Sequence, residues 1–263
     1  SESQKQGVLT LLYKKGDKRN LDNWRPISLL NTDYKIIARV MSHRLQKVLH
    51  KIISSDQTGY IKGRSASDNL RLVQDIIDYC HILKKKGILI FLDFKKAFDC
   101  VSHKFLRGCL KRFKFKESFI KWIEVLYIDA TGKVKNNGWF TNSFKIERGI
   151  RQGCPLSALL FVLVVEVMAS RVRSNMNIQG ISIPIHKEPY FYDVRISQLA
   201  DDATLFVDSV DSGNNAMQEV LKFGEFAGLQ LNLGKTKILP LNVDINETSC
   251  INNLEWTQEP ITY

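Results

Sequence analysis

Two periods of hydrophobic and polar residues run along this 263-residue chain, one typical of helices and one of strands. Apolar residues three or four positions apart predict amphipathic helices over residues 34–52, 68–83, 102–113, 118–126 and 214–227. Runs of β-prone residues predict strands at 8–12, 88–92 and 203–207. The run from Leu156 to Val167, begun by Pro155, is apolar nearly all round and should form a buried central helix.

Turn and cap residues divide these elements. We expect a turn at residues 23–26, a hairpin around Asn137-Gly138 and a strand pair about Gly234-Lys235. Asn31 or Thr32 should cap the first long helix, and Gly87 should stop the second after its lysines 84–86. The residues expected to face inward on these two helices are Tyr34, Ile37, Met41, Leu45, Val48, Leu49 and Ile52, then Leu70, Val73, Ile76, Ile77, Cys80 and Leu83. Helices mixed with antiparallel strands indicate an α+β fold.

Composition narrows the class of protein. A hydrophobic fraction of 44% and a charged fraction of 25% are ordinary for a globular protein, whereas a net charge of +11 favours a polyanionic partner such as nucleic acid. Five cysteines without a CxxC pair indicate neither a disulfide framework nor a zinc site. The apolar run at 155–165 is too short to span a bilayer, and the first residues resemble no signal peptide. We therefore expect a soluble intracellular protein.

Acidic residues mark the candidate chemistry. Asp201 and Asp202 lie between alternating runs, Val194 and Ile196 before them and residues 203–207 after, which predicts a hairpin with the acidic pair at its tip. Adjacent like charges repel, and Mg²⁺ would remove that repulsion, although an ordinary polar turn is the alternative. Asp93 follows the buried strand 88–92, where the alternative is a helix cap or a strand-end ion pair.

If these segments are neighbours, the three carboxylates meet at one edge of a sheet. Such a site can hold two Mg²⁺ ions about 3.5–4 Å apart. That arrangement suits the in-line attack of a hydroxyl group on a phosphate.

Several motifs resemble those of reverse transcriptases. Residues 91–99 resemble motif A, 148–157 motif B, 199–202 motif C and 228–237 motif D, while 23–29 and 57–65 resemble the fingers motifs of the non-LTR (LINE-type) retrotransposon branch. The motifs follow the order of the family over most of residues 8–241. Leu199 stands where the family usually has an aromatic residue, a change that could alter packing at the primer end.

The resemblance implies roles for individual residues. Asp93 and Asp201 would bind two Mg²⁺ ions, or Mn²⁺ as an alternative, with help from the Phe94 carbonyl, and Asp202 would support the primer-terminus side. Lys235 would protonate the leaving pyrophosphate as a general acid, or serve as an ordinary surface lysine.

Further residues are implied as substrate contacts. Phe98, five residues after Asp93, matches the steric gate that disfavours a 2′-OH, and its alternative role is a core aromatic. Gln152 would contact the incoming nucleotide and the template strand. Lys62 and Arg64 would hold the triphosphate, or lie solvated in a loop.

The resemblance also implies an architecture of right-hand polymerase fingers and palm, with an antiparallel palm sheet flanked by helices. Fingers are expected over residues 1–87, with 115–148 returning toward them, and the palm over 88–263. The chain stops at residues 261–263, which resemble the start of the primer grip. The thumb is therefore expected to be absent, and the chain to be part of a larger polyprotein with endonuclease and thumb.

The expected activity is RNA-directed DNA synthesis, which joins a dNTP to a primer 3′-OH by two-Mg²⁺ nucleotidyl transfer. RNA template, DNA primer and dNTP are the expected partners, without a membrane, in a ribonucleoprotein of nucleus and cytoplasm. Two alternatives stay open: a catalytically inactive nucleic-acid-binding remnant, and a reverse transcriptase of the group II intron maturase type.

Overall fold

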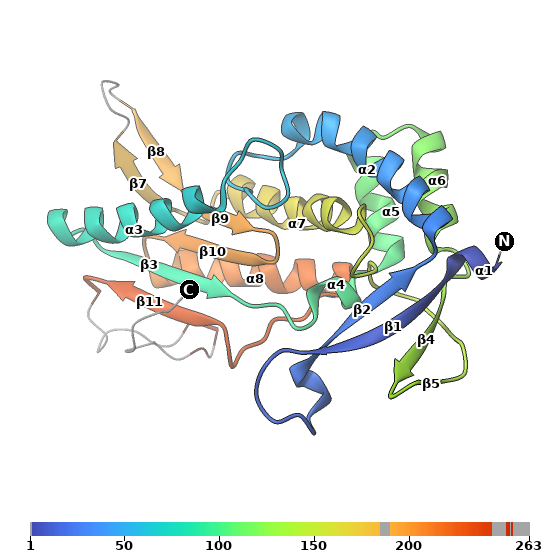
Figure 1. The fold of residues 1–263 in the computed structure, drawn as a ribbon. Coiled ribbons are helices and arrows are strands. Elements are labelled where there is room, and N and C mark those ends of the chain that lie inside the picture. The colour runs from blue at the N-terminus through green and yellow to red at the C-terminus, as the bar shows by residue number, and fades with distance from the viewer. Residues whose placement is uncertain (1, 185–189, 244–250, 253, 255–263) are drawn as a thin grey trace. The chain divides into compact units, whose positions relative to one another are not determined.

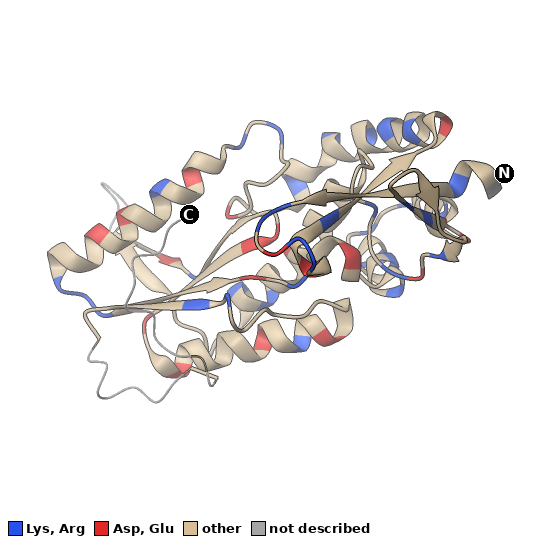
Figure 2. Ribbon diagram, turned by 60° about the horizontal axis from the view of Figure 1, so that its bottom comes forward, with Lys and Arg blue, Asp and Glu red and all other residues tan. Residues whose placement is uncertain are grey.

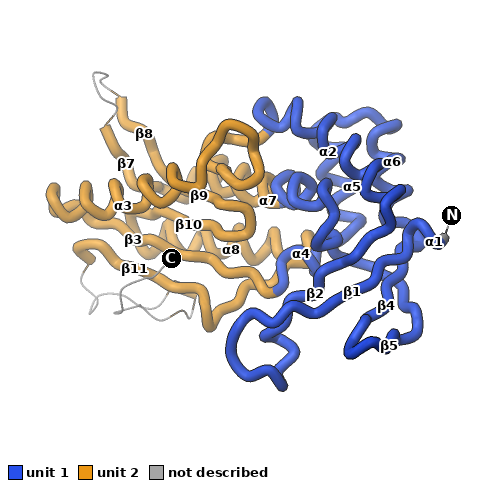
Figure 3. Tube along the Cα trace, in the orientation of Figure 1, with its two compact units in different colours: residues 1–52, 96–164 blue, residues 53–95, 165–263 orange. Residues whose placement is uncertain are grey.

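The computed structural model describes residues 2–184, 190–243, 251–252 and 254. The chain divides into two compact units, one formed by residues 1–52 and 96–164 and the other by residues 53–95 and 165–263 (Figure 3). We call them unit 1 and unit 2. Cys250 and the primer-grip resemblance at 261–263 lie outside the described residues.

Unit 1 contains a mixed sheet with strand order β2-β1-β4-β5, and β6 also pairs with β4. The strands are β1 (Gln6–Tyr13), β2 (Trp24–Leu30), β4 (Thr131–Asn136), β5 (Trp139–Phe140) and β6 (Phe144–Lys145). β1 pairs antiparallel with β2 and parallel with β4. The β4–β5 hairpin turns at Asn137 and Gly138, both with positive φ, as the sequence predicted.

The helices of unit 1 are α1 (Glu2–Lys5), α2 (Thr32–Ile52), α4 (Ala97–Cys100), α5 (His103–Arg112), α6 (Glu117–Tyr127) and the first part of α7 (Ser157–Ser174). Asn31 begins α2, since its side chain accepts a hydrogen bond from the Asp33 amide at 3.0 Å. α7 is buried along almost its whole length, from Leu159 to Val172, which confirms the predicted central helix.

Unit 2 contains an antiparallel sheet with strand order β11-β3-β10-β9 (Figure 1). The strands are β3 (Gly87–Leu92), β9 (Ile196–Leu199), β10 (Asp202–Val207) and β11 (Lys237–Leu241), and a separate pair is formed by β7 (Ile181–Pro184) and β8 (Phe191–Val194). β3 pairs with both β10 and β11, so it lies inside the sheet, as its continuous hydrophobic run predicted.

Two helices, α3 (Ala66–Leu83) and α8 (Val210–Ala227), cover opposite faces of this sheet (Figures 1 and 2). On the α3 side, Val73, Ile76 and Cys80 pack with Leu89 and Phe206. Successive strand residues point to opposite faces, so the neighbours of Leu89 at 88 and 90 face the other layer and are equally buried. Ser65 caps α3 in a capping box with Asp68.

The prediction of a turn at residues 23–26 is wrong. A short 3₁₀ helix at Leu21–Asn23 makes the turn instead, and Trp24, Arg25 and Pro26 already belong to β2. Pro26 is tolerated there because β2 is an edge strand of its sheet, where a missing N–H donor leaves no ladder bond unmade.

Gly87 does not end the second long helix. Lys84 takes the left-handed conformation at the C-cap, with φ of +51°, and its amide donates to carbonyls of the last turn. Gly87 opens β3 instead, where a Cβ would lie 2.8 Å from the Ile181 side chain. The small size of the glycine lets the Ile181 side chain pack closely against β3, and it does not terminate the helix.

Some predicted core positions are exposed. On α2, Ile37 and Val48 lie at the edge of the buried stripe, and on α3 the side chains of Leu70 and Leu83 are about half exposed. The buried stripes are therefore narrower than hydrophobicity alone indicates, and the buried face of α3 also includes the polar Asn69.

The strand pair expected about Gly234-Lys235 is also different. Residues 233–235 form a turn, but the segments on either side pair with the chain around β3 rather than with each other. Leu231 bridges to Phe94, and β11 pairs with β3 from Gly87 to Phe91. β3 and the residues that follow it are extended and offer unpaired backbone groups, so both segments pair with them instead.

None of the helices within the described residues is long and apolar enough to cross a membrane. Cys80, Cys100, Cys109 and Cys154 are free thiols.

Candidate active site

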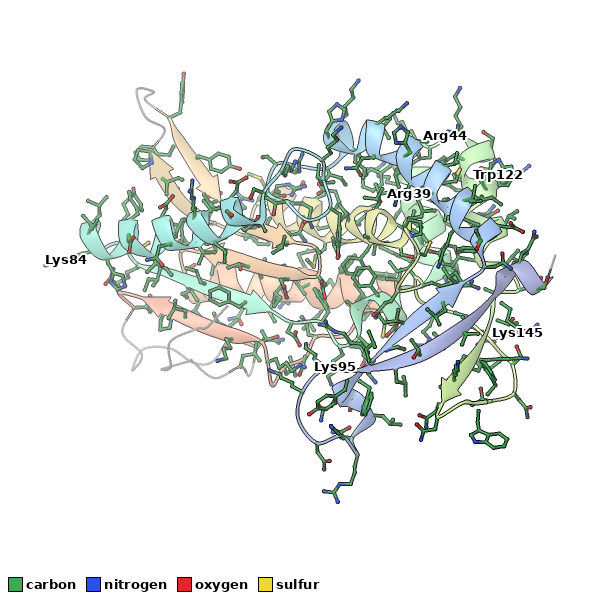
Figure 4. The ribbon with its side chains drawn as sticks, in the orientation of Figure 1. Arg39, Arg44, Lys84, Lys95, Trp122 and Lys145 are labelled. Atoms are coloured by element: carbon green, nitrogen blue, oxygen red, sulfur yellow. The ribbon has the colours of Figure 1, made fainter. Side chains whose placement is uncertain are left out.

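Asp93 directly follows the central strand β3. The chain beyond it is held by backbone hydrogen bonds: the Asn232 amide donates to the Asp93 carbonyl at 2.7 Å, and the Lys95 amide donates to the Gln230 carbonyl at 2.8 Å (Lys95 is labelled in Figure 4). The Asp93 side chain is 36% exposed. Its backbone is therefore fixed while its carboxylate stays accessible.

Lys235 lies beside this carboxylate, with its Nζ 3.9 Å from Asp93 Oδ2. The turn at 233–235 brings it there, so the structure places two of the predicted residues together. Because the lysine is 63% exposed, the ion pair contributes little to stability.

Asp201 and Asp202 lie at the β9–β10 hairpin. Ala200 and Asp201 form the turn, and Ala200 is buried with φ of +58°. Asp202 begins β10 and is exposed, while Asp201 is partly buried.

The strand register brings the acidic residues to one end of the sheet. The β3–β10 ladder runs to the pair Leu92↔Ala203, so Asp93 and Asp202 are the next residues on the two strands and Asp201 follows. Like charges on adjacent strands repel, which makes this sheet edge a place where a cation would be stabilising. Among the described residues, no group of three or more histidine, cysteine or acidic side chains is arranged to hold a metal ion. The three-carboxylate metal set stays a prediction.

The predicted triphosphate contacts differ from each other. Lys62 is exposed. Arg64 is partly buried, and its guanidinium donates to the backbone carbonyls of Ile53, Ser54 and Gln57. In this structure Arg64 holds its own loop together, and its role toward a triphosphate stays a prediction.

Phe98 and Gln152 belong to unit 1. The Phe98 ring stacks on Phe161 of α7, with ring centroids 4.6 Å apart, and the Phe98 carbonyl accepts a hydrogen bond from the Ile150 amide at 2.7 Å. Phe98 thus has the core contact that was its alternative role. Its function as a steric gate is not tested by these contacts.

Gln152 is held near the same segment. Its Nε2 donates to the two Asp99 carboxylate oxygens at 3.3 and 3.4 Å. Burial raises the pKa of Asp99, and the hydrogen bond from Gln152 opposes that rise. A Cβ at Gly149 would lie 2.6 Å from the Asp99 carbonyl oxygen, so only glycine lets the two segments approach this closely. Sequence reasoning missed Asp99 as the partner of Gln152.

Unit 1 also carries a hollow of mainly apolar surface, lined in part by two basic residues. A cavity of about 720 Å³ is lined by Lys35, Ile36, Arg39 and Val40 of α2 together with residues 153–155. Lys35 and Arg39 are exposed, and basic residues outnumber acidic ones along this helix (Figure 2; Arg39 and Arg44 are labelled in Figure 4).

Sequence reasoning missed the buried polar residues of unit 2 that hold the acidic hairpin. Asn69 donates to the Ser197 hydroxyl and the Gln198 carbonyl, at 2.7 and 2.8 Å. The Ala200 amide donates a hydrogen bond to the Gln57 side-chain oxygen at 3.0 Å. The available signal for Asn69 was its position one turn before Val73, where a polar residue interrupts an inward-facing stripe.

An antiparallel sheet covered by helices on two faces, with acidic residues gathered at one end of its central strands, is the arrangement found in the palm of nucleic-acid polymerases. The model of the family described as reverse transcriptase (RNA-dependent DNA polymerase) matches residues 13–263. The chain therefore belongs to the reverse transcriptase family.

Similar proteins show to which branch of this family the chain belongs. The chain is 34% identical over 269 aligned residues to the transposon TX1 uncharacterized 149 kDa protein of Xenopus laevis, covering 99% of this chain and 20% of that protein. It is 29% identical to the retrovirus-related Pol polyprotein from the type-1 retrotransposable element R2 of Popillia japonica, covering 86% of this chain and 31% of that protein. This is a reverse transcriptase domain of the non-LTR, LINE-type branch. It spans less than a third of the length of these relatives.

The fold comparison agrees. A structure of apo telomerase from Candida tropicalis matches 90% of this chain and 44% of that chain, with a TM-score of 0.63 and 14% sequence identity. The polymerase fold of fingers and palm is thereby confirmed, while the residue boundaries predicted for fingers and palm stay predictions.

Proposed function

We propose that this chain catalyses RNA-directed DNA synthesis, joining a dNTP to the 3′-OH of a DNA primer on an RNA template. The observation that carries the proposal is the strand register that gathers Asp93, Asp201 and Asp202 at one end of the unit 2 sheet in a chain of the reverse transcriptase family. The motif resemblance suggests the reaction, and the strand register supports it by bringing these acidic residues to the same end of the sheet.

Reverse transcriptases generally use divalent metal ions. The donor set here consists of carboxylate oxygens with a neighbouring backbone carbonyl at Phe94, which are the hard ligands that Mg²⁺ prefers. Mg²⁺ is commonly held by one or two carboxylates together with substrate phosphates, so Asp93 and Asp201 suit it, with Asp202 beside them and Mn²⁺ as an alternative ion. When bound, two such ions would lower the pKa of the primer hydroxyl and neutralise the leaving pyrophosphate.

The remaining roles belong to side chains of the chain itself. Lys235, beside Asp93, is placed to give a proton to the departing pyrophosphate, and the exposed Lys62 is available to a triphosphate. Phe98 is proposed to select the sugar and Gln152 to contact nucleotide and template, both on the strength of the motifs. Arg64 is assigned first to holding the loop.

The proposed partners follow from the charge and the family. The net charge of +11 and the basic face of α2 support binding to the phosphates of a template and primer. The relatives are long proteins of which this domain is a fraction, which supports a parent polyprotein that also supplies endonuclease and thumb. A ribonucleoprotein in nucleus and cytoplasm is the setting we propose for it.

The test is extension of a labelled DNA primer on an RNA template in Mg²⁺. Wild-type chain should extend the primer, and Asp201→Asn, which keeps the side-chain shape and removes the charge, should abolish extension. Asp75→Asn, the same change at an exposed position on α3, is the matched control and should retain it. Wild-type chain that binds the primer–template but never extends it would favour the inactive remnant.

A further inference from the structure

A loop outside the palm sheet lies against its acidic hairpin. Residues 56–58 pair with β9, the edge strand of the sheet: Gln57 forms a parallel bridge with Gln198, the Thr58 amide donates to the Gln198 carbonyl at 2.9 Å, and the Gln198 amide donates to the Asp56 carbonyl at 2.7 Å. The loop thus extends the sheet by one short segment, next to the turn that carries Asp201.

The Gln57 side chain reaches the turn itself. It is completely buried, and its Oε1 accepts hydrogen bonds from the Ala200 amide at 3.0 Å and from the Gly59 amide at 2.7 Å. Its Nε2 lies 3.5 Å from the Ala200 carbonyl. Both backbone groups of the residue before Asp201 therefore contact one side chain.

Ala200 needs such support. Its φ of +58° is in the left-handed region, which is unfavourable for a residue with a Cβ, and alanine has no polar side chain that could stabilise the turn locally. Its amide is also buried, so loss of the Gln57 acceptor would leave a donor without a partner.

The supporting loop is itself anchored. Arg64 donates to the Gln57 carbonyl at 2.6 Å and to the Ile53 carbonyl at 2.9 Å. Thr58 hydrogen-bonds to Asn69, which in turn holds the end of β9. These bonds fix the backbone around Gln57, so its side-chain amide is oriented toward the turn.

We propose that Gln57 is a positioning residue that holds the Ala200–Asp201 turn so that the Asp201 carboxylate is presented for metal binding. This role rests on the proposed function of Asp201 as a metal ligand. Gln57 itself touches neither substrate nor metal. It acts through the backbone of Ala200.

The first test needs no catalysis. In the metal-free 263-residue chain, Gln57→Leu removes the acceptor at nearly constant volume, and hydrogen exchange of the Ala200 amide, measured by NMR, should accelerate about tenfold or more. The second readout is Mn²⁺ binding followed by electron paramagnetic resonance, in which Gln57→Leu should bind about fivefold more weakly because the carboxylate is no longer held in place.

Gln198→Leu is the matched control. Gln198 is a buried glutamine on β9 whose side-chain amide has no hydrogen-bond partner among the described residues, so the same substitution there should leave exchange at Ala200 and Mn²⁺ affinity within about twofold of wild type. Should Gln57→Leu fail to fold, Gln57→Asn retains the amide but shortens its reach, and it should show the same two losses.

In an active chain, the Mg²⁺ concentration for half-maximal extension should rise with Gln57→Leu while the KM for primer–template stays within about twofold, a split that general destabilisation does not produce. Ala200 exchange and Mn²⁺ affinity equal to wild type in Gln57→Leu would overturn the proposal. Wild-type chain that binds Mn²⁺ at Asp201 without extending a primer would count against the proposed function alone.

Discussion

Gly59→Ala should damage the acidic hairpin from a distance of more than a hundred residues in sequence. A Cβ at position 59 would lie 2.4 Å from the Ala200 backbone nitrogen and 2.9 Å from its Cα. These are backbone atoms of a buried turn, so they cannot swing aside as the end of a flexible side chain could. Either the loop or the turn must move.

The expected magnitude follows from these contacts. Overpacking in a closed site costs about 1–3 kcal/mol. Separation of the two segments also weakens the hydrogen bond from the Ala200 amide to Gln57, which adds about 1 kcal/mol. We expect a loss of about 2–4 kcal/mol in the free energy of unfolding. Because Asp201 is the next residue, a displacement near 1 Å should also reduce turnover by about 10²-fold.

Urea unfolding and primer extension measure the two effects. Gly108→Ala is the control, since Gly108 lies exposed in α5 with open space around the new Cβ, and alanine should stabilise that helix by about 0.5–1 kcal/mol. Gly59→Ala with wild-type stability and wild-type turnover would refute the reasoning, because it would mean that the loop does not press on the turn.

Three further changes test other parts of the structure. Burial raises the pKa of Glu166 to about 6 from its ordinary 4.5, so the protonated form favours the folded state, and this stabilisation is complete below pH 4.5 and lost as the pH rises through 6. Glu166 also pairs with Arg173, an interaction that Gln weakens at every pH, so the pKa determines only the change with pH. The stability of Glu166→Gln relative to wild type should therefore rise by up to about 2 kcal/mol between pH 4.5 and pH 7.5, as urea unfolding at the two pH values would reveal. Lys235→Ala should leave stability within about 0.5 kcal/mol because its ion pair with Asp93 is exposed, yet lower single-turnover extension by about 10²-fold; an unchanged rate would exclude it as the general acid. Replacing Lys35 and Arg39 by glutamine should weaken RNA binding and reduce the slope of log affinity against log salt by about 1.4, and an unchanged slope would exclude this hollow as a phosphate contact.

Local rules predicted the elements that local interactions build. β3 could be predicted because an unbroken β-prone run has few alternatives. α3 begins at Ala66, two residues before the predicted start, and the Ser65–Asp68 capping box is the local signal that would have located it. The turn at Asn137-Gly138 follows from residues that accept positive φ. In each case the deciding contacts lie within a few residues of one another.

The errors occurred where distant contacts decide. Gly87 follows a lysine run as a helix-terminating glycine often does, but in the structure it opens β3 and the Ile181 side chain packs against it. Leu70 and Leu83 have helical spacing, yet no neighbouring segment covers them within the described part of the chain. Periodicity identifies a helix more securely than it identifies which edge of its apolar stripe is buried.

The candidate site divides in the same way. Asp93 and Asp201 could be found because acidic residues at the ends of hydrophobic strands are unusual and because the motifs repeat a known order. The Gln57–Ala200 contact could not be found, since it joins residues 143 positions apart through backbone atoms that any sequence possesses. Only the approach of two folded segments makes that glutamine distinctive.

The two central carboxylates are supported by different means, and both supports act on the backbone. Asp93 is fixed through its carbonyl by Asn232, and Asp201 is fixed through the preceding residue by Gln57. Neither support occupies a carboxylate oxygen, and the Lys235 ion pair at Asp93 is a weak, exposed contact. Backbone rigidity combined with accessible carboxylates is what a site needs when its remaining ligands arrive with the substrate. It follows that substitutions in residues 56–59 and 230–232 should alter metal binding more than substrate affinity.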